Sequence, residues 1–253
     1  MSPATIGVIS TACVFGGALI GFGLQRLLPK HHLSKESQDV IKLGAGVIAT
    51  VTALVLGLLV SSAKSSFDSM NSRVTQMGAS AIILDRALAE YGPEAKNARE
   101  LLRRSVESTL HKIWPEERTS VSAVSVVERG GAIEALQTEL SQITPRNDAQ
   151  RQLLAQAQQL ASDASHSRWM LIEEAQNELP NPLLVVLVLW LTVLFVSFGL
   201  FAPRNATVVT ALFLGACTMS AAIFLVLEMN RPLDGFIKVS SAPMRKALEF
   251  LGK

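Results

Sequence analysis

Four long apolar stretches, each without charged residues or histidine, dominate the hydrophobic pattern of the chain. They cover residues 4–24, 43–63, 183–202 and 206–227. A hydrocarbon core of about 30 Å needs roughly 20 helical residues, and in lipid an α-helix satisfies its backbone hydrogen bonds internally. The pattern therefore predicts four transmembrane helices.

The polar stretch between the second and third spans, residues 64–180, shows helical periodicity. Because no proline occurs between Leu43 and Gly92, we expect the second span to continue into this stretch as one helix. Its apolar residues follow alternating steps of three and four, the 3.5-residue period of a coiled-coil seam: Phe67, Met70, Val74, Met77, Ala81, Leu84, Leu88 and Tyr91.

Further helices are expected over residues 94–113 and 132–143, and a long one is expected to start at Asn147 or Asp148 and end near Leu179. The predicted fold class is all-α. It comprises a transmembrane hairpin (1–63), a large helical soluble insert (64–180), a second transmembrane hairpin (181–229), and a turn with a short amphipathic helix (230–253). The apolar side of this last helix could dock on the insert, or Arg245 and Lys246 could hold it against lipid headgroups.

Charge and motifs narrow the functional classes. The insert carries 13 Lys or Arg and 16 Asp or Glu, and no basic patch interleaved with aromatic residues predicts nucleic-acid binding. The sequence has no phosphate-binding glycine loop, HExxH or CxxC, and Cys13 and Cys217 both lie in apolar spans. We therefore expect no enzymatic activity, no metal site and no cofactor.

One face of the second span carries small and hydroxylic side chains at helical spacing. These are the candidate pore-lining residues, with Phe67 next along the same helix: Gly46, Thr50, Ala53, Gly57, Ser61 and Lys64. Small residues let helices approach closely in lipid. Alternatively, the strip faces a central pore in a homo-oligomer, where Lys64 would raise the local anion concentration and exclude cations.

A charged cluster follows the fourth span, in the sequence "FLVLEMNRPLDGF". It contains Glu228, Arg231, Pro232, Asp234 and Gly235. A carboxylate in the last turn of a helix is repelled by the helix dipole and needs a nearby cation. Three interpretations remain open. The cluster could be a local charge pair and turn that ends the helix, a ring around a permeation vestibule, or a site for a ligand or lipid headgroup.

Three segments resemble the bestrophin-like family of bacterial and plant membrane proteins. They are "LEMNRPLDGFIKVSSAPMRKAL" (227–248), "LVLGLLVSSAKSSFD" (54–68) and "LDRALAEYGPEAKNARELLRRSV" (84–106). A more distant similarity to bestrophins proper implies four spans, a large helical cytosolic insert and an oligomer whose second spans line an anion pore. It also implies that the insert and both termini are cytosolic. Lysine and arginine counts alone do not decide this, because the first loop and the C-terminal tail are both basic.

Two hypotheses from different classes follow. The first is an oligomeric anion channel of the cell membrane that passes chloride or other anions. The second is a non-conducting scaffold whose insert binds a soluble partner. A motor stator would need an ionisable residue at a membrane helix interface, and the charge-free spans argue against that class.

Overall fold

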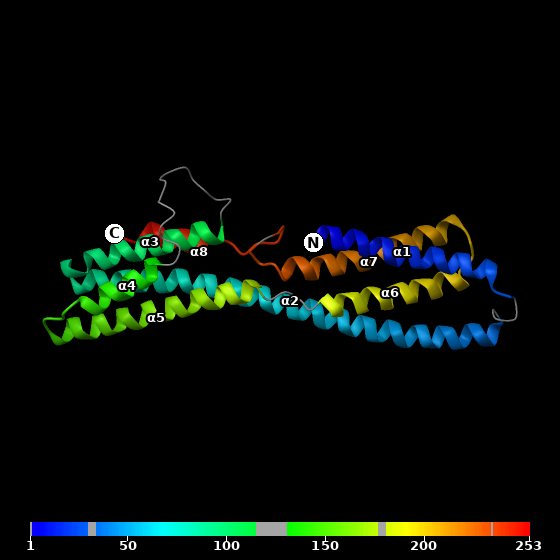
Figure 1. The fold of residues 1–253 in the computed structure, drawn as a ribbon, viewed down its shortest axis with the longest axis horizontal. Coiled ribbons are helices and arrows are strands. Elements are labelled where there is room, and N and C mark those ends of the chain that lie inside the picture. Colours follow the sequence, from blue (N-terminus) through cyan, green and yellow to red (C-terminus); the bar gives the residue numbers. More distant parts are fainter. Residues whose placement is uncertain (1, 30–33, 115–130, 177–180, 234) are drawn as a thin grey trace. The chain divides into compact units, whose positions relative to one another are not determined.

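The computed structural model describes residues 2–29, 34–114, 131–176, 181–233 and 235–253, and every regular element in these ranges is helical (Figure 1). The α-helices, with the short 3-10 helix η2, are α1 (Pro3–Leu27), α2 (Lys35–Tyr91), η2 (Pro93–Ala95), α3 (Lys96–Ile113), α4 (Gly131–Gln142), α5 (Asp148–Gln176), α6 (Asn181–Phe201), α7 (Ala206–Met229) and α8 (Ala242–Phe250). Within the described ranges, α1, α2, α6 and α7 are long and apolar enough to cross a membrane.

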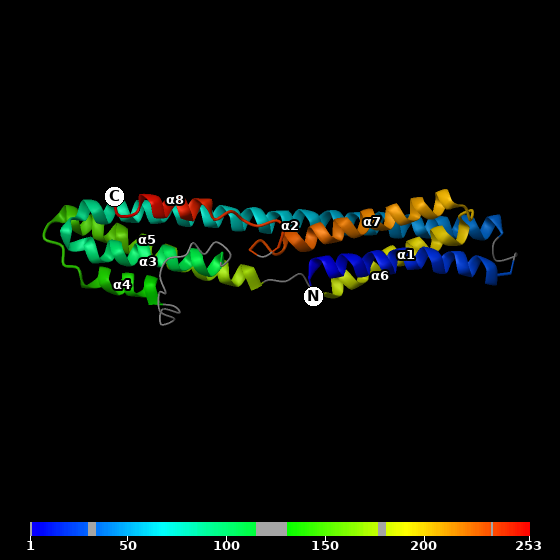
Figure 2. The same cartoon turned by 90° about the horizontal axis from the view of Figure 1, so that it is seen from above.

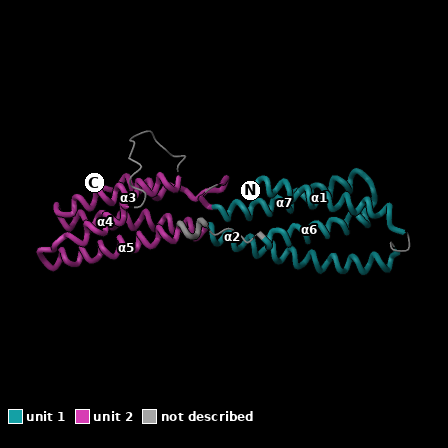
Figure 3. Tube along the Cα trace, in the orientation of Figure 1, with its two compact units in different colours: residues 1–67, 178–231 teal, residues 68–177, 232–253 magenta. Residues whose placement is uncertain are grey.

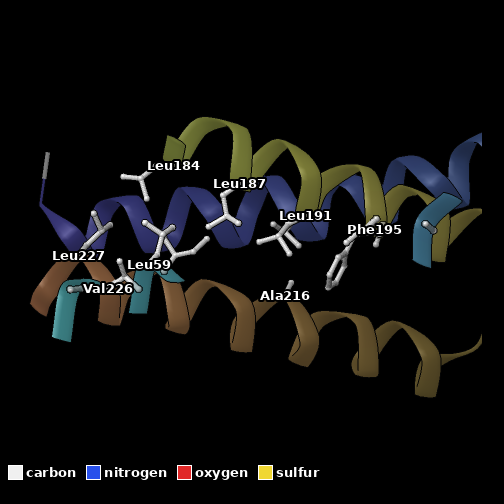
Figure 4. Packing of buried hydrophobic residues seen from close by; sticks show 14 residues of the cluster. Leu59, Leu184, Leu187, Leu191, Phe195, Ala216, Val226 and Leu227 are labelled. Atoms are coloured by element: carbon white, nitrogen blue, oxygen red, sulfur yellow. The ribbon is translucent and has the colours of Figure 1, made fainter. Parts of the chain in front are cut away.

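The chain forms two compact units, shown in Figure 3. Unit 1 comprises residues 1–67 and 178–231, and unit 2 comprises residues 68–177 and 232–253. Helix α2 is continuous over 57 residues and contributes to both. The core of unit 1 is made by apolar side chains from α1, α2, α6 and α7, as Figure 4 shows for Leu59, Leu187, Leu191 and Val226.

Glycines bring α1 and α6 into backbone contact inside unit 1. A Cβ atom added to Gly17 would lie 2.8 Å from the carbonyl oxygen of Thr192, and one on Gly21 would overlap the backbone of Val196 and Leu200. From the other side, a Cβ on Gly199 would overlap the backbone of Ala18. This is the small-residue packing that lets helices associate closely in lipid.

The second hairpin is a tight one, as its sequence predicts. Helix α6 ends at Phe201 and α7 begins at Ala206. Asn205 caps α7, because its side-chain oxygen accepts a hydrogen bond of 2.8 Å from the backbone N–H of Val208. Arg204 in the connection donates to the side-chain oxygen of Gln25 at 2.8 Å and to the carbonyl of Phe22, which ties the hairpin to the end of α1.

Unit 2 is a helical bundle built around the C-terminal part of α2, with α3, α4, α5 and α8 beside it (Figures 1 and 2). Six seam residues of α2 are buried: Met70, Val74, Ala81, Leu84, Leu88 and Tyr91. The apolar seam of α2 that the sequence predicts is therefore covered by other helices of the same chain. It gives no support to a coiled coil between copies.

Helix α8 docks on this bundle, which decides between the two interpretations of its apolar side. Met244, Ala247 and Leu251 are each at most 3% exposed. Where α8 begins, a Cβ added to Gly78 of α2 would lie 2.7 Å from the carbonyl oxygen of Pro243. Arg245 and Lys246 are exposed, on the side away from the buried stripe.

The main correction to the sequence-based bounds concerns the start of α2. The helix begins at Lys35, not at Leu43, because the polar residues before the apolar stretch are also helical. The Ser34 hydroxyl accepts a hydrogen bond of 3.3 Å from the backbone N–H of Ser37, which satisfies one of the free donors at the helix start. Helix α3 begins at Lys96, two residues later than expected, because η2 intervenes.

Candidate functional site

The strip on α2 is exposed along its length in the part of the chain that the structure describes. Gly46, Thr50, Ala53, Gly57, Ser61 and Lys64 are all exposed, and Phe67 is half-buried. A Cβ atom added to Gly46 or Gly57 would meet nothing within 4 Å. The six small or hydrophilic positions therefore form one continuous surface on the protomer, which is called the α2 strip below.

Helix geometry separates the α2 strip from the face by which α2 packs. Ala45, Thr52, Leu59 and Ala63 are buried and define the packed face. With about 100° per residue, the α2 strip lies about 130° around the helix from that face. A third face carries exposed large apolar residues, namely Val47 (66%), Leu54 (64%) and Leu58 (63%). Only this third face has the character of a surface that contacts acyl chains.

The polar groups of the α2 strip are compatible with an aqueous surface. The Thr50 hydroxyl donates to the carbonyl oxygen of Gly46 at 2.9 Å, so its hydrogen is used and its oxygen lone pairs point outward from the helix. Ser61 adds a second exposed hydroxyl, and Lys64 places a cation one turn further on. The strip thus runs from small apolar residues to a charged end.

The cluster after α7 differs in character from the α2 strip. Glu228 is 2% exposed although it lies in the last turn of the helix. Its carbonyl oxygen accepts the backbone N–H of Arg231 at 3.0 Å, Pro232 is buried, and Gly235 has φ of 124°. Asp234 lies outside the described residues. The burial of Glu228 within its own protomer favours the interpretation of a local helix end over that of an exposed ring.

Sequence reasoning missed a buried ion pair in unit 2. Asp85 of α2 is 4% exposed, and Arg99 of α3 donates to it from Nε and from Nη2, each at 2.8 Å. The hydrogen bonds to Asp85 raise the pKa of Arg99 above its usual value, so the guanidinium stays charged. The two residues are 14 positions apart on different helices, so no periodic pattern could have linked them.

Unit 2 also contains a small pocket between α2, α3, α4, α5 and α8. Its wall is largely apolar, with Leu84, Leu102 and Met244 among the lining residues. Arg168 is its one charged lining residue, and its Nη1 lies 3.7 Å from Oε2 of Glu134. Within the described ranges, no three His, Cys, Asp or Glu side chains come together in a way that could hold a metal ion.

Comparison with known proteins identifies the family. The sequence matches the family described as Bestrophin-like domain over residues 12–244. A sequence search among curated proteins finds no match.

Solved structures share the fold. A crystal structure of a bacterial bestrophin homologue from Klebsiella pneumoniae, carrying a single substitution, superposes with a TM-score of 0.71 at 14% identity, covering 96% of this chain and 97% of that one. A second structure of such a homologue from the same organism gives 0.69 at 12% identity, covering 96% of each chain. A crystal structure of a membrane protein with a point substitution also gives 0.69 at 12% identity, covering 98% and 99%.

These likenesses agree with the helices described above. The apolar helices of unit 1 and the family together make this a membrane protein. The chain belongs to the bestrophin-like family.

Proposed function

We propose that the protein is a homo-oligomeric anion channel of the cell membrane in which the α2 strip lines an axial pore. The observation that carries the proposal is the open space beside Gly46 and Gly57 on a helix whose other face is packed. An exposed surface of small and hydroxylic residues differs from the apolar face of Leu54 and Leu58 beside it. In an oligomer such a surface can line water around the symmetry axis.

Anion preference follows from the charge at the end of the strip. The spans carry no acidic side chain along the α2 strip, and Lys64 from each protomer would form a positive ring at one mouth. Such a ring raises the local concentration of chloride and repels cations. The pore proposed here has no aromatic residue between Leu43 and Phe67, so small side chains would set its width.

The proposed orientation places the insert (64–180) and both termini in the cytosol. With this orientation Lys64 lies at the cytosolic mouth, where it would meet cytosolic anions. The numbers of lysine and arginine residues on the two sides do not decide the orientation. The support for it comes from the family resemblance.

Purified full-length protein reconstituted in liposomes tests the proposal. Chloride efflux above that of empty liposomes is the expected result, and Lys64→Glu should lower chloride selectivity over sodium. Lys112→Glu, which changes an exposed lysine of α3 in unit 2, is the matched control and should leave selectivity unchanged. Liposomes that stay tight at all voltages and pH values would refute conduction.

The second candidate function is a membrane-anchored interaction protein. The observation in its favour is Trp169 on α5, which is 58% exposed with the Arg168 guanidinium 5.8 Å from its ring. Aromatic side chains such as this exposed tryptophan are enriched where proteins bind partners. Tight liposomes together with a photo-cross-link from position 169 to a soluble protein would favour this function over conduction.

A further inference from the structure

The loop between α7 and α8 is held in a closed shape at its base. The backbone N–H of Val239 donates to the carbonyl oxygen of Pro232 at 2.8 Å, and both residues are buried. The carbonyl oxygen of Val239 accepts a hydrogen bond of 3.0 Å from the indole N–H of Trp114 at the end of α3. The base of the loop therefore belongs to unit 2, and residues 235–238, which are exposed, form the tip of the loop.

The tip exposes apolar side chains to an unusual degree. Phe236 is 85% exposed, the highest value among the large apolar side chains that the structure describes, and Ile237 beside it is 37% exposed. Lys238 follows and is also exposed. Leaving a phenylalanine in water forgoes about 1.5–3 kcal/mol of burial free energy. A loop whose base is held by hydrogen bonds, and which leaves these apolar side chains exposed, is suited to an environment other than bulk water.

The chain length places this tip near the end of an apolar span. Phe236 follows Met229, the last residue of α7, by seven positions, so it can lie at most about 25 Å from that residue. The closed base of the loop shortens this reach. Segments that lie at the membrane interface place side chains such as Phe and Leu in the acyl boundary, while Lys side chains reach the headgroups.

We propose that Phe236, Ile237 and Lys238 insert into the headgroup region of the bilayer and anchor unit 2 at the membrane surface. The occupant of this surface is the lipid itself: acyl carbons for the two apolar side chains, and anionic phosphates for Lys238. This proposal rests on the assignment of α7 as a membrane span. A second copy of the chain is the competing occupant, and the experiment separates the two.

Spin labels on the full-length protein in nanodiscs containing anionic lipid provide the test. In a Cys13→Ser, Cys217→Ser background, a label at position 236 is compared with one at Leu225 on α7 and one at Phe250 on α8. Leu225 and Phe250 are 40% and 45% exposed, so each tolerates a label. At position 236 the ratio of oxygen to polar nickel-complex collisions should be several-fold higher than at 250 and close to that at 225.

Each other outcome overturns the proposal in a recognisable way. A water-exposed label at 236 with a lipid-exposed label at 225 refutes the anchor and leaves the span intact. Water exposure at both positions refutes the span assignment as well. Protection from both reagents at 236, with dipolar broadening between labels, identifies a second copy as the occupant.

A second measurement avoids the label altogether. Phe236→Trp is a conservative change at an exposed site, so the protein should fold. Its additional fluorescence over the parent protein should be quenched by brominated lipid, and less so after Lys238→Glu in anionic bilayers. Equal emission with and without brominated lipid contradicts the anchor independently of the label results.

Discussion

Arg99 on α3 holds the carboxylate of Asp85 on α2 by two parallel hydrogen bonds, each 2.8 Å long. The same carboxylate also accepts the backbone N–H of Gly252 at 3.3 Å, and Arg99 donates to the carbonyl oxygen of Lys253 at 3.1 Å. One buried ion pair thus ties together α2, α3 and the residues after α8. Arginine suits this pair because its planar guanidinium presents two N–H groups at the spacing of the two carboxylate oxygens.

Breaking this pair should destabilise unit 2 strongly. Asp85→Ala leaves a mostly buried guanidinium without its carboxylate, and we expect a loss of about 2–3 kcal/mol after allowing for the partial exposure of Arg99. Chemical denaturation of the detergent-solubilised protein measures it. The control is Arg104→Ala, which removes an exposed pair with Glu100 and should cost at most about 0.5 kcal/mol. Equal effects of the two variants would contradict a structural role for the buried pair.

The glycine contact between α1 and α6 gives a second prediction. Gly199→Val should destabilise unit 1 by about 3 kcal/mol or disrupt its folding, because its side chain would meet the backbone of Ala18. Gly23→Val, on α1 where an added Cβ meets nothing within 4 Å, is the matched control and should be tolerated. The midpoint of thermal unfolding in detergent compares them. A tolerated Gly199→Val would show that the helices are further apart.

Gly57→Leu distinguishes the possible surroundings of the α2 strip. In a pore, the added side chain should reduce chloride flux several-fold while the oligomer stays intact, because it occupies the space that water fills. In a helix–helix interface, it should instead dissociate the oligomer, as seen by size-exclusion chromatography with light scattering. Leu58→Phe, on the apolar face beside the strip, is the control. Unchanged flux and unchanged oligomer for Gly57→Leu would place the strip against lipid.

A smaller effect is expected at the start of α5. Asn147 accepts a hydrogen bond of 2.7 Å from the backbone N–H of Gln150 through its side-chain oxygen, so it caps this helix. Asn147→Ala should cost about 1 kcal/mol, whereas Asn147→Asp keeps an acceptor and should cost little. Denaturation midpoints of the two variants provide the comparison. A loss from Asn147→Asp as large as that from Asn147→Ala would rule out a capping role.

The sequence predicts the helices well because their signals are local. Apolar stretches of span length, the heptad steps from Met70 to Tyr91 and the cap at Asn147 each act over a few residues. The start of α2 was missed because the polar residues from Lys35 onward show no apolar period, although a helix can continue through them. The local sequence pattern therefore predicts which segments are helical more reliably than it predicts the residue at which a helix begins.

The site was predicted only in part, for physical reasons. Spacing alone shows that Gly46 and Gly57 share a face, but it does not show what that face meets outside the protomer. The Asp85–Arg99 pair joins residues brought together by the turn at Gly92, where φ is 123°. The α1–α6 contact joins distant segments: Gly17 and Gly21 have the four-residue spacing that favours close helix packing, but the sequence does not show that α6 is the helix they meet.

The close approach of α1 and α6 has a consequence for biogenesis. Arg204 and Gln25, which meet beside that contact, are 179 positions apart. During synthesis the first apolar helix must therefore wait in the translocon or the lipid until the whole insert has been translated before its closest neighbour emerges. Over that interval the glycine surface of α1 lacks the helix that covers it in the folded protein.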